Sequence, residues 1–180
     1  MELQQLWICL GQRIKMKRAL LAILMSLAIP ALSCAGQFKV VRVTDGDTIK
    51  VDNNGKTSII RLVGIDAPEK SKKKNDPGQP FSQKSTKYLA GLVLNRSVEI
   101  KSYGTDRYGR TLGVVYLDGK NVNLEMVQAG LAEVYRGSPA KGLDLNAYKK
   151  AEKEARDAGR GMWSLGDRYV SPREWRKMQK

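Results

Sequence analysis

The sequence predicts an α+β protein that is mainly β, with five short strands and three helices in one domain. Three observations support this prediction: valine-rich runs that alternate with polar residues, turn-forming residues between them, and apolar residues at helical spacing elsewhere. The chain has 180 residues and no internal repeat. That length suits one domain with a buried core, together with a segment removed on processing.

Five segments are expected to form strands: residues 38–44, 48–51, 58–63, 98–102 and 112–117. The first alternates valine with polar residues, which is the pattern of a strand with one buried face. The second and third are joined by Asp-Asn-Asn-Gly, whose residues tolerate the positive φ of a tight turn. We therefore expect these two strands to form a hairpin.

Three further segments are expected to form helices: residues 82–94, 123–129 and 145–158. Ser82 suits the N-cap of the first, and a glycine directly follows both the second and the third, as at a helix C-terminus. The first helix lies between the third and fourth strands. This order is that of a five-stranded OB-fold barrel, a frame often used to hold oligonucleotides.

Residues 1–35 have the layout of a leader. Basic residues precede an apolar run of 11 residues, and small residues follow it, so we expect a signal peptide over residues 16–35 that is cleaved after Ala35. Residues 1–15 are interpreted as an extension from an upstream start. Two alternatives stay open, lipidation of Cys34 and a retained membrane anchor, although the run is shorter than the roughly 20 residues of a spanning helix.

The charge balance and the missing histidine restrict the chemistry. Lys and Arg number 32 against 18 Asp and Glu, a net charge of +14, which favours a polyanionic partner. The chain has no histidine, which excludes Ser-His-Asp and Cys-His catalysis and histidine-ligated zinc. Its two cysteines, Cys9 and Cys34, both fall in the leader, so the mature domain is expected to fold without disulfides.

Carboxylates gather in two short clusters. Asp45 and Asp47 stand at the junction of the first two strands, where they suit either a tight turn or a hard cation such as calcium. Arg61 interrupts an apolar strand, and Asp66 and Glu69 follow that strand closely. These two acids could cap a loop, but beside the first cluster and the arginine they favour a working site.

A third cluster, residues 105–110, leads into the last strand. Arg107 and Arg110 flank Tyr108, an arrangement that is either a solvated turn or a set of donors for phosphate beside an aromatic face for a base.

Together these clusters resemble the staphylococcal (micrococcal) nuclease family, also called thermonucleases. The resemblance extends from about residue 39 to residue 163 and rests on five motifs in order. They are Val43-Thr-Asp-Gly-Asp-Thr48, Arg61-Leu-Val-Gly-Ile-Asp-Ala-Pro-Glu69, Asp106-Arg-Tyr-Gly-Arg110, Val122-Asn-Leu-Glu-Met-Val-Gln-Ala-Gly-Leu-Ala132 and Met162-Trp-Ser164.

The resemblance implies a calcium-dependent phosphodiesterase, an endonuclease or exonuclease, that cuts single-stranded or frayed DNA and RNA with little sequence preference and leaves 3′-phosphate ends. It assigns calcium to Asp47, Asp66 and the backbone carbonyl of Ala67, with Asp45 in the outer shell. Ala67 stands where the best-known member has threonine, but a carbonyl ligand does not depend on the side chain.

The resemblance also assigns the catalytic groups. Glu69 matches the residue that orients or deprotonates the attacking water, and Arg61 and Arg110 match the two catalytic arginines. Arg107, Tyr108 and Tyr135 are expected to contact the nucleotide. Of these, Arg107 stands where lysine is usual, and Tyr135 only approximates a second tyrosine in a segment that is shorter here.

These inferences predict one domain organisation, and they leave two alternatives to the nuclease function. We expect a leader over residues 1–35, a nuclease domain over residues 36–167 with Trp163 in its core, and a basic surface tail over residues 168–180. The mature protein is expected to be a monomer without a membrane span, exported to the periplasm or the medium. The rivals are a non-catalytic OB-fold module that binds nucleic acid and a cationic periplasmic scaffold; both leave the carboxylate clusters unexplained.

Overall fold

The computed structural model describes residues 37–71, 73 and 75–179. The expected leader and its two alternatives lie outside these residues. In the part of the chain that is described, no helix combines the length and the apolar character needed to cross a membrane.

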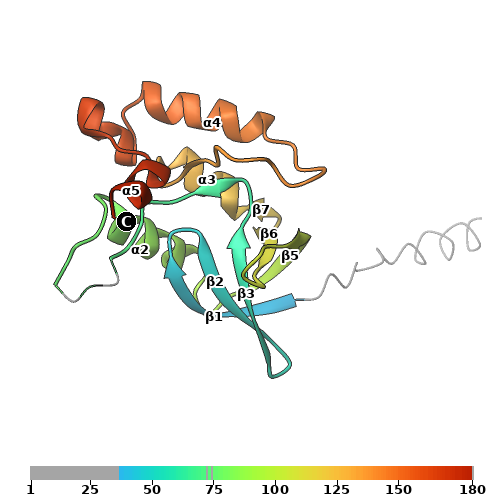
Figure 1. Ribbon diagram of the computed structural model, residues 1–180. Coiled ribbons are helices and arrows are strands. Elements are labelled where there is room, and N and C mark those ends of the chain that lie inside the picture. Colours follow the sequence, from blue (N-terminus) through green and yellow to red (C-terminus); the bar gives the residue numbers. More distant parts are fainter. Residues whose placement is uncertain (1–36, 72, 74, 180) are drawn as a thin grey trace, which may run out of the picture. The chain divides into compact units, whose positions relative to one another are not determined.

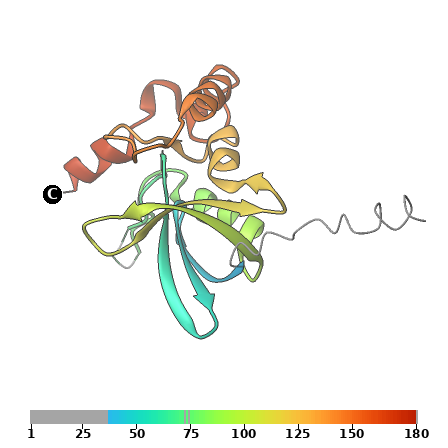
Figure 2. The ribbon, with the colours of Figure 1, turned by 90° about the vertical axis from the view of Figure 1, so that its right-hand side faces the viewer.

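Five strands close into a barrel (Figures 1 and 2). They are β1 (Gln37–Asp45), β2 (Thr48–Asn53), β3 (Lys56–Leu62), β5 (Ser97–Thr105) and β6 (Thr111–Leu117). The order β3-β2-β1-β5-β6 is antiparallel throughout, and a parallel pairing of β3 with β6 closes it. This closure confirms the predicted five-stranded OB-fold barrel.

The local sequence explains the β2–β3 hairpin. Its turn residues Asn54 and Gly55 have φ values of 51° and 84°, as expected of residues that tolerate the left-handed region. Because side chains alternate across a strand, β2 sends Ile49 and Val51 into the barrel and β3 sends Ile60 and Leu62. Lys50 and Arg61, which stand between these residues, face away from the barrel interior, and Arg61 is nevertheless only 17% exposed.

Three short strands lie outside the barrel. Strands β4 (Ile65–Asp66) and β8 (Glu133–Val134) pair with each other as a separate antiparallel ribbon. Strand β7 (Lys120–Asn121) pairs antiparallel with the end of β6. The ribbon matters for the site because it holds Asp66 just beyond the end of β3.

The three predicted helices are present as α2 (Ser82–Val93), α3 (Val122–Gln128) and α4 (Asn146–Asp157). Gly130 and Gly159 follow α3 and α4 with φ values of 66° and 60°, as predicted for the position after a helix. The expected N-cap of α2 was wrong. Phe81 is the cap, and Ser82 is the first helical residue, with its buried hydroxyl donating to the Pro77 carbonyl at 3.3 Å.

The expected number of helices was also wrong, because the described residues contain two more. They are the 3-10 helix η1 (Gly161–Arg168), interrupted at Gly166, and the α-helix α5 (Pro172–Met178), which lies in the segment expected to be a surface tail. Both are too short to show a clear apolar period. The start of α5 is nevertheless marked locally, by a capping box between Ser171 and Glu174.

The C-terminal elements have a small core of their own. Trp163 and Met162 are buried beside Ala155 of α4, and the ring of Tyr169 packs on Trp163 at 4.5 Å between centroids. Trp163 is therefore a core residue, as predicted. This packing fixes the chain just before α5, which lies close to α2 (Figure 1).

Candidate active site

Asp47 occupies the turn between β1 and β2 and points inward. Its carboxylate accepts hydrogen bonds from the Thr48 hydroxyl at 3.0 Å and the Ala67 amide at 2.9 Å, and it contacts the Arg61 guanidinium. The turn can pack closely against α2 because residue 46 is glycine: a Cβ there would lie 1.9 Å from Ser85 Oγ. The first cluster is thus both a turn and a buried charge.

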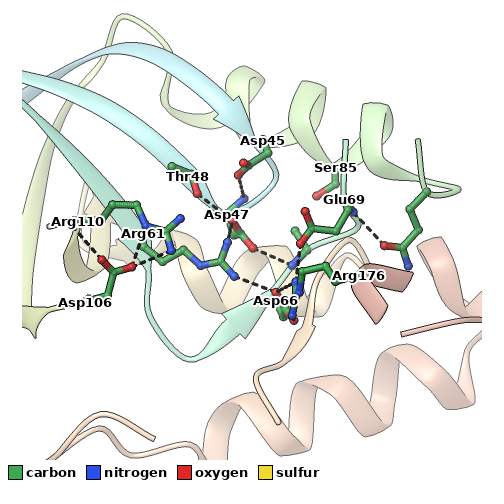
Figure 3. Close-up of polar contacts among 12 residues, drawn as sticks. Asp45, Asp47, Thr48, Arg61, Asp66, Glu69, Ser85, Asp106, Arg110 and Arg176 are labelled. Atoms are coloured by element: carbon green, nitrogen blue, oxygen red, sulfur yellow. Dashed lines mark hydrogen bonds and ion pairs between the residues drawn. The ribbon is translucent and has the colours of Figure 1, made fainter. Parts of the chain in front are cut away.

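Arg61 joins the two buried aspartates (Figure 3). Its guanidinium contacts Asp47 through Nη1 and donates from Nη2 to Asp66 Oδ1 at 2.8 Å. Both aspartates are only 1% exposed. The alternation of β3 aims Arg61 at this end of the barrel, while the β4–β8 ribbon brings Asp66 back toward it.

The close packing of these charges shifts their ionisation. Burial raises the pKa of Asp47 well above its ordinary value; Asp45 and Asp66 raise it further, while Arg61 opposes them. Burial acts to lower the pKa of Arg61, but the carboxylates of Asp47 and Asp66 outweigh it and raise that pKa overall. Arg61 therefore remains charged.

Glu69 lies on the loop after β4 and is held by Gln79. The Glu69 backbone amide donates to Gln79 Oε1 at 2.9 Å, and the Gln79 backbone amide donates to the Glu69 backbone carbonyl at 2.9 Å. The Gln79 side chain continues to the carbonyl of Val170 at 2.7 Å, which ties this loop to the start of α5.

One residue that reaches these carboxylates was not predicted from the sequence. Arg176 of α5 donates to both oxygens of Asp66, at 3.0 and 2.7 Å, and also contacts Glu69. It stands 107 residues after Glu69, so no local spacing could have indicated the contact.

Arg110 lies on the turn between β5 and β6, at the same end of the barrel. It pairs with Asp106. The Asp106 carboxylate accepts hydrogen bonds from Arg110 Nε at 2.8 Å and from the backbone amides of Tyr108 and Arg110 at 2.9 and 3.0 Å. Burial acts to raise the pKa of Asp106, but these hydrogen bonds outweigh it and lower that pKa. The parallel register of Ile60 with Thr111 places this turn beside Arg61 (Figure 3).

The three expected nucleotide contacts fall into two places. Tyr108 is 69% exposed at the tip of the β5–β6 turn, with the Arg107 guanidinium 4.9 Å from its ring. Tyr135 instead lines a cleft of about 530 Å³ together with Asp66, Arg136, Arg173 and Arg176. The structure therefore brings Tyr135 to the carboxylates and leaves Arg107 and Tyr108 on the turn that carries Arg110.

The donor set fits a hard cation that needs few side-chain ligands. Among the described residues, no three His, Cys, Asp or Glu side chains cluster as a metal site. Asp47 and Asp66 do converge, since one guanidinium spans them. Calcium accepts carboxylate, carbonyl and water oxygens together, so two carboxylates with the Ala67 carbonyl and water suit it. The assignment of these ligands stays a prediction.

Comparison with known proteins identifies the family of this chain. The family model described as staphylococcal nuclease homologue matches residues 59–165. An uncharacterized endonuclease of Haemophilus influenzae is 40% identical over 143 residues, which cover 79% of this chain and 74% of that protein. A micrococcal nuclease of Shigella flexneri is 40% identical, covering 79% of this chain and 81% of its own length. A thermonuclease of Staphylococcus hyicus is 34% identical, covering 71% and 75%. The chain belongs to the staphylococcal nuclease family.

Proposed function

We propose that the protein is an exported, calcium-dependent nuclease that hydrolyses DNA and RNA with little sequence preference and leaves 3′-phosphate ends. Membership of the staphylococcal nuclease family makes it a nuclease, an enzyme that hydrolyses phosphodiester bonds. The metal, the range of substrates, the product ends and export are the proposal. The observation that carries it is Arg61 spanning Asp47 and Asp66 next to Glu69.

Phosphodiester hydrolysis explains why such a site concentrates charge. The substrate is an anion, and its transition state gathers further negative charge on the non-bridging oxygens, so fixed positive groups lower the barrier. Arg61 uses two of its five N–H donors on Asp47 and Asp66, and the fork geometry of the others suits a phosphate. When bound, calcium would add positive charge beside the scissile phosphate and a place for the attacking water.

Glu69 and Arg110 complete the proposed chemistry. Glu69 orients the attacking water and accepts its proton; its backbone is held by Gln79, so the carboxylate starts from a defined position. Arg110 approaches the phosphate from the β5–β6 turn, with Asp106 fixing its guanidinium. Arginine suits both roles better than lysine because it keeps its proton and offers two parallel donors.

Substrate attraction rests on the overall charge. Residues 1–35 hold four Lys or Arg against one Glu, so the mature chain keeps 14 − 3 = 11 of the net positive charges. This charge favours a polyanion at long range, and this part of the binding is expected to weaken as salt increases. The exposed ring of Tyr108 and the half-exposed ring of Tyr135 offer surfaces on which bases can stack. Neither feature distinguishes one base from another, in agreement with low sequence preference.

One assay tests the proposal. The mature chain is incubated with single-stranded DNA and with RNA, in calcium and in a chelator, and the products are sized and their ends identified. We expect both substrates to shorten in calcium only, with 3′-phosphate ends. Arg96→Lys, a change in an exposed pair with Asp118, serves as a control that should cut normally. Binding without cutting would instead favour the non-catalytic module. A protein that neither binds nor cuts nucleic acid would favour the scaffold.

Export has its own test. N-terminal sequencing of the protein recovered from the periplasm or the medium is expected to begin at Gly36, after cleavage behind Ala35. A lipidated Cys34, or a protein retained with its full N-terminus, would contradict this part of the proposal. A size measurement in solution should give a monomer.

A further inference from the structure

Arg176 is bound to two of the proposed active-site carboxylates although it comes from the last helix of the described chain. Its guanidinium faces Asp66 in a two-pronged contact, with Nη1 3.0 Å from Oδ1 and Nη2 2.7 Å from Oδ2, and Nη1 also contacts Glu69. The hydrogen bond with Asp66 is the main cause that raises the pKa of Arg176, and burial opposes it. The contact therefore stabilises the charged guanidinium.

Several anchors hold α5 in the position that allows this contact. The Tyr169 hydroxyl donates to Glu133 at 2.6 Å, and Gln79 donates to the Val170 carbonyl at 2.7 Å. Ser171 and Glu174 then form a capping box around Pro172, which fixes the first turn of the helix. Because Gln79 also binds the Glu69 backbone, α5 and the Glu69 loop are held by one side chain.

The result is a row of alternating charges (Figure 3): Asp47, Arg61, Asp66, Arg176 and Glu69. Each carboxylate in the row has at least one guanidinium partner. At Asp47 and Asp66, which are 1% exposed, such pairing offsets part of the cost of burying charge, whereas Arg176 and Glu69 are 38% and 34% exposed and their pairing is weaker.

A cation that enters this row must share the Asp66 carboxylate with two arginines. Both Asp66 oxygens already accept from Arg176, and Oδ1 also accepts from Arg61. A divalent cation on the same carboxylate would stand close to the Arg176 guanidinium, and the two like charges would repel at short range. Because Arg176 is 38% exposed, solvent screens part of this repulsion. The cation and Arg176 therefore oppose each other.

We propose that Arg176 is a positioning residue that holds Asp66 and Glu69 in the metal-free protein and competes with the divalent cation for Asp66. This inference rests on the proposed function, since it takes Asp66 as a cation ligand. It assigns α5 the role of setting the cation concentration that the enzyme requires. Arg176 and Tyr135 line the same cleft, so a displaced Arg176 would keep its positive charge close to any phosphate bound there.

The test is calcium binding to the substrate-free mature protein, measured by calorimetry for wild type, Arg176→Gln and Arg173→Gln. Arg173 is the matched control because it lies on the same helix and lines the same cleft, and within the described chain no ion pair is found for it. We expect Arg176→Gln to bind calcium about tenfold more tightly, the scale of a charged hydrogen bond, and Arg173→Gln to stay within about twofold of wild type.

Thermal unfolding is a second readout that a merely structural role would not reproduce. In chelator, Arg176→Gln should unfold at a lower temperature than wild type, because Asp66 and Glu69 lose a partner. In saturating calcium the difference should shrink or reverse. A structural role predicts a loss that is equal in both conditions.

The outcomes separate this inference from the proposed function. If wild type binds calcium and cuts nucleic acid while Arg176→Gln binds calcium no more tightly than Arg173→Gln, the competition is wrong and the nuclease proposal stands. If wild type neither binds calcium nor needs it for cutting, the proposed metal fails and the inference fails with it.

Discussion

The two arginines assigned to catalysis are held in opposite ways. Arg61 is 17% exposed and contacts carboxylates from two other elements of the fold. Arg110 is 30% exposed and pairs with Asp106, four residues away on the same turn. One is fixed by tertiary structure and the other by local structure.

This difference has an energetic consequence. The buried centre formed by Asp47, Arg61 and Asp66 depends on every member, because removing one partner leaves an uncompensated charge out of water. The β5–β6 turn can lose a contact and still leave the barrel intact. We therefore expect substitutions in the centre to affect both stability and activity, and substitutions in the turn to affect activity alone.

The largest effect is expected at the catalytic groups. Arg61→Lys keeps the charge but loses the two-pronged contacts, and Glu69→Ala removes the proposed base, so each should lower turnover by at least about two orders of magnitude. Initial rates on single-stranded DNA at saturating calcium check this. Near-normal turnover in either purified variant would remove that residue from the mechanism, and Arg96→Lys controls for an arginine lost elsewhere.

A weaker effect is expected at the support of Arg110. Asp106→Ala removes the acceptor for the Arg110 side chain and for the amides of Tyr108 and Arg110, so the guanidinium is no longer held in place. We expect kcat to fall about tenfold, less than for loss of a catalytic group, with an unfolding temperature close to wild type. A large fall in that temperature would show that the turn is not independent of the barrel.

The same contrast between local and tertiary contacts decides which parts of the fold and site could be predicted from the sequence. The barrel strands and the β2–β3 hairpin were predictable because alternation and turn residues are local signals, and the structure confirms them. The link from Arg61 to Asp66 spans only five residues around a strand end and was also within reach. The bond from Arg176 to Asp66 spans 110 residues and depends on how η1 and α5 pack, which no local pattern encodes.

A still smaller effect is expected at the tip of the turn. Tyr108→Ala removes a ring that is mostly exposed. The guanidinium carbons of Arg107 and Arg110 lie 4.9 and 5.5 Å from the centre of this ring. If this ring stacks on a base, KM should rise several-fold while kcat changes little, because the contact binds ground state and transition state alike. Steady-state kinetics on an oligonucleotide check this. A fall in kcat with constant KM would assign Tyr108 to positioning Arg110 instead.

The smallest effect concerns Glu133, which shows what burial costs next to the centre. This carboxylate is 1% exposed, and its Oε1 has no hydrogen-bond partner in the described structure. Burial raises the pKa of Glu133, while the Tyr169 hydrogen bond and Arg136 oppose the shift. The folded protein therefore holds this proton more tightly than the unfolded chain, so the stabilisation is present below the ordinary glutamate pKa and is lost as pH rises through the raised value.

Glu133→Gln removes that ionisation while its amide oxygen can still accept from the Tyr169 hydroxyl. We expect the variant to unfold a few degrees higher than wild type at neutral pH and to show no such gain near pH 4, where wild type is also protonated. Thermal unfolding in chelator at both pH values checks this without interference from metal. An equal change at the two values would mean that the shape of the side chain, rather than its charge, decides stability at this position.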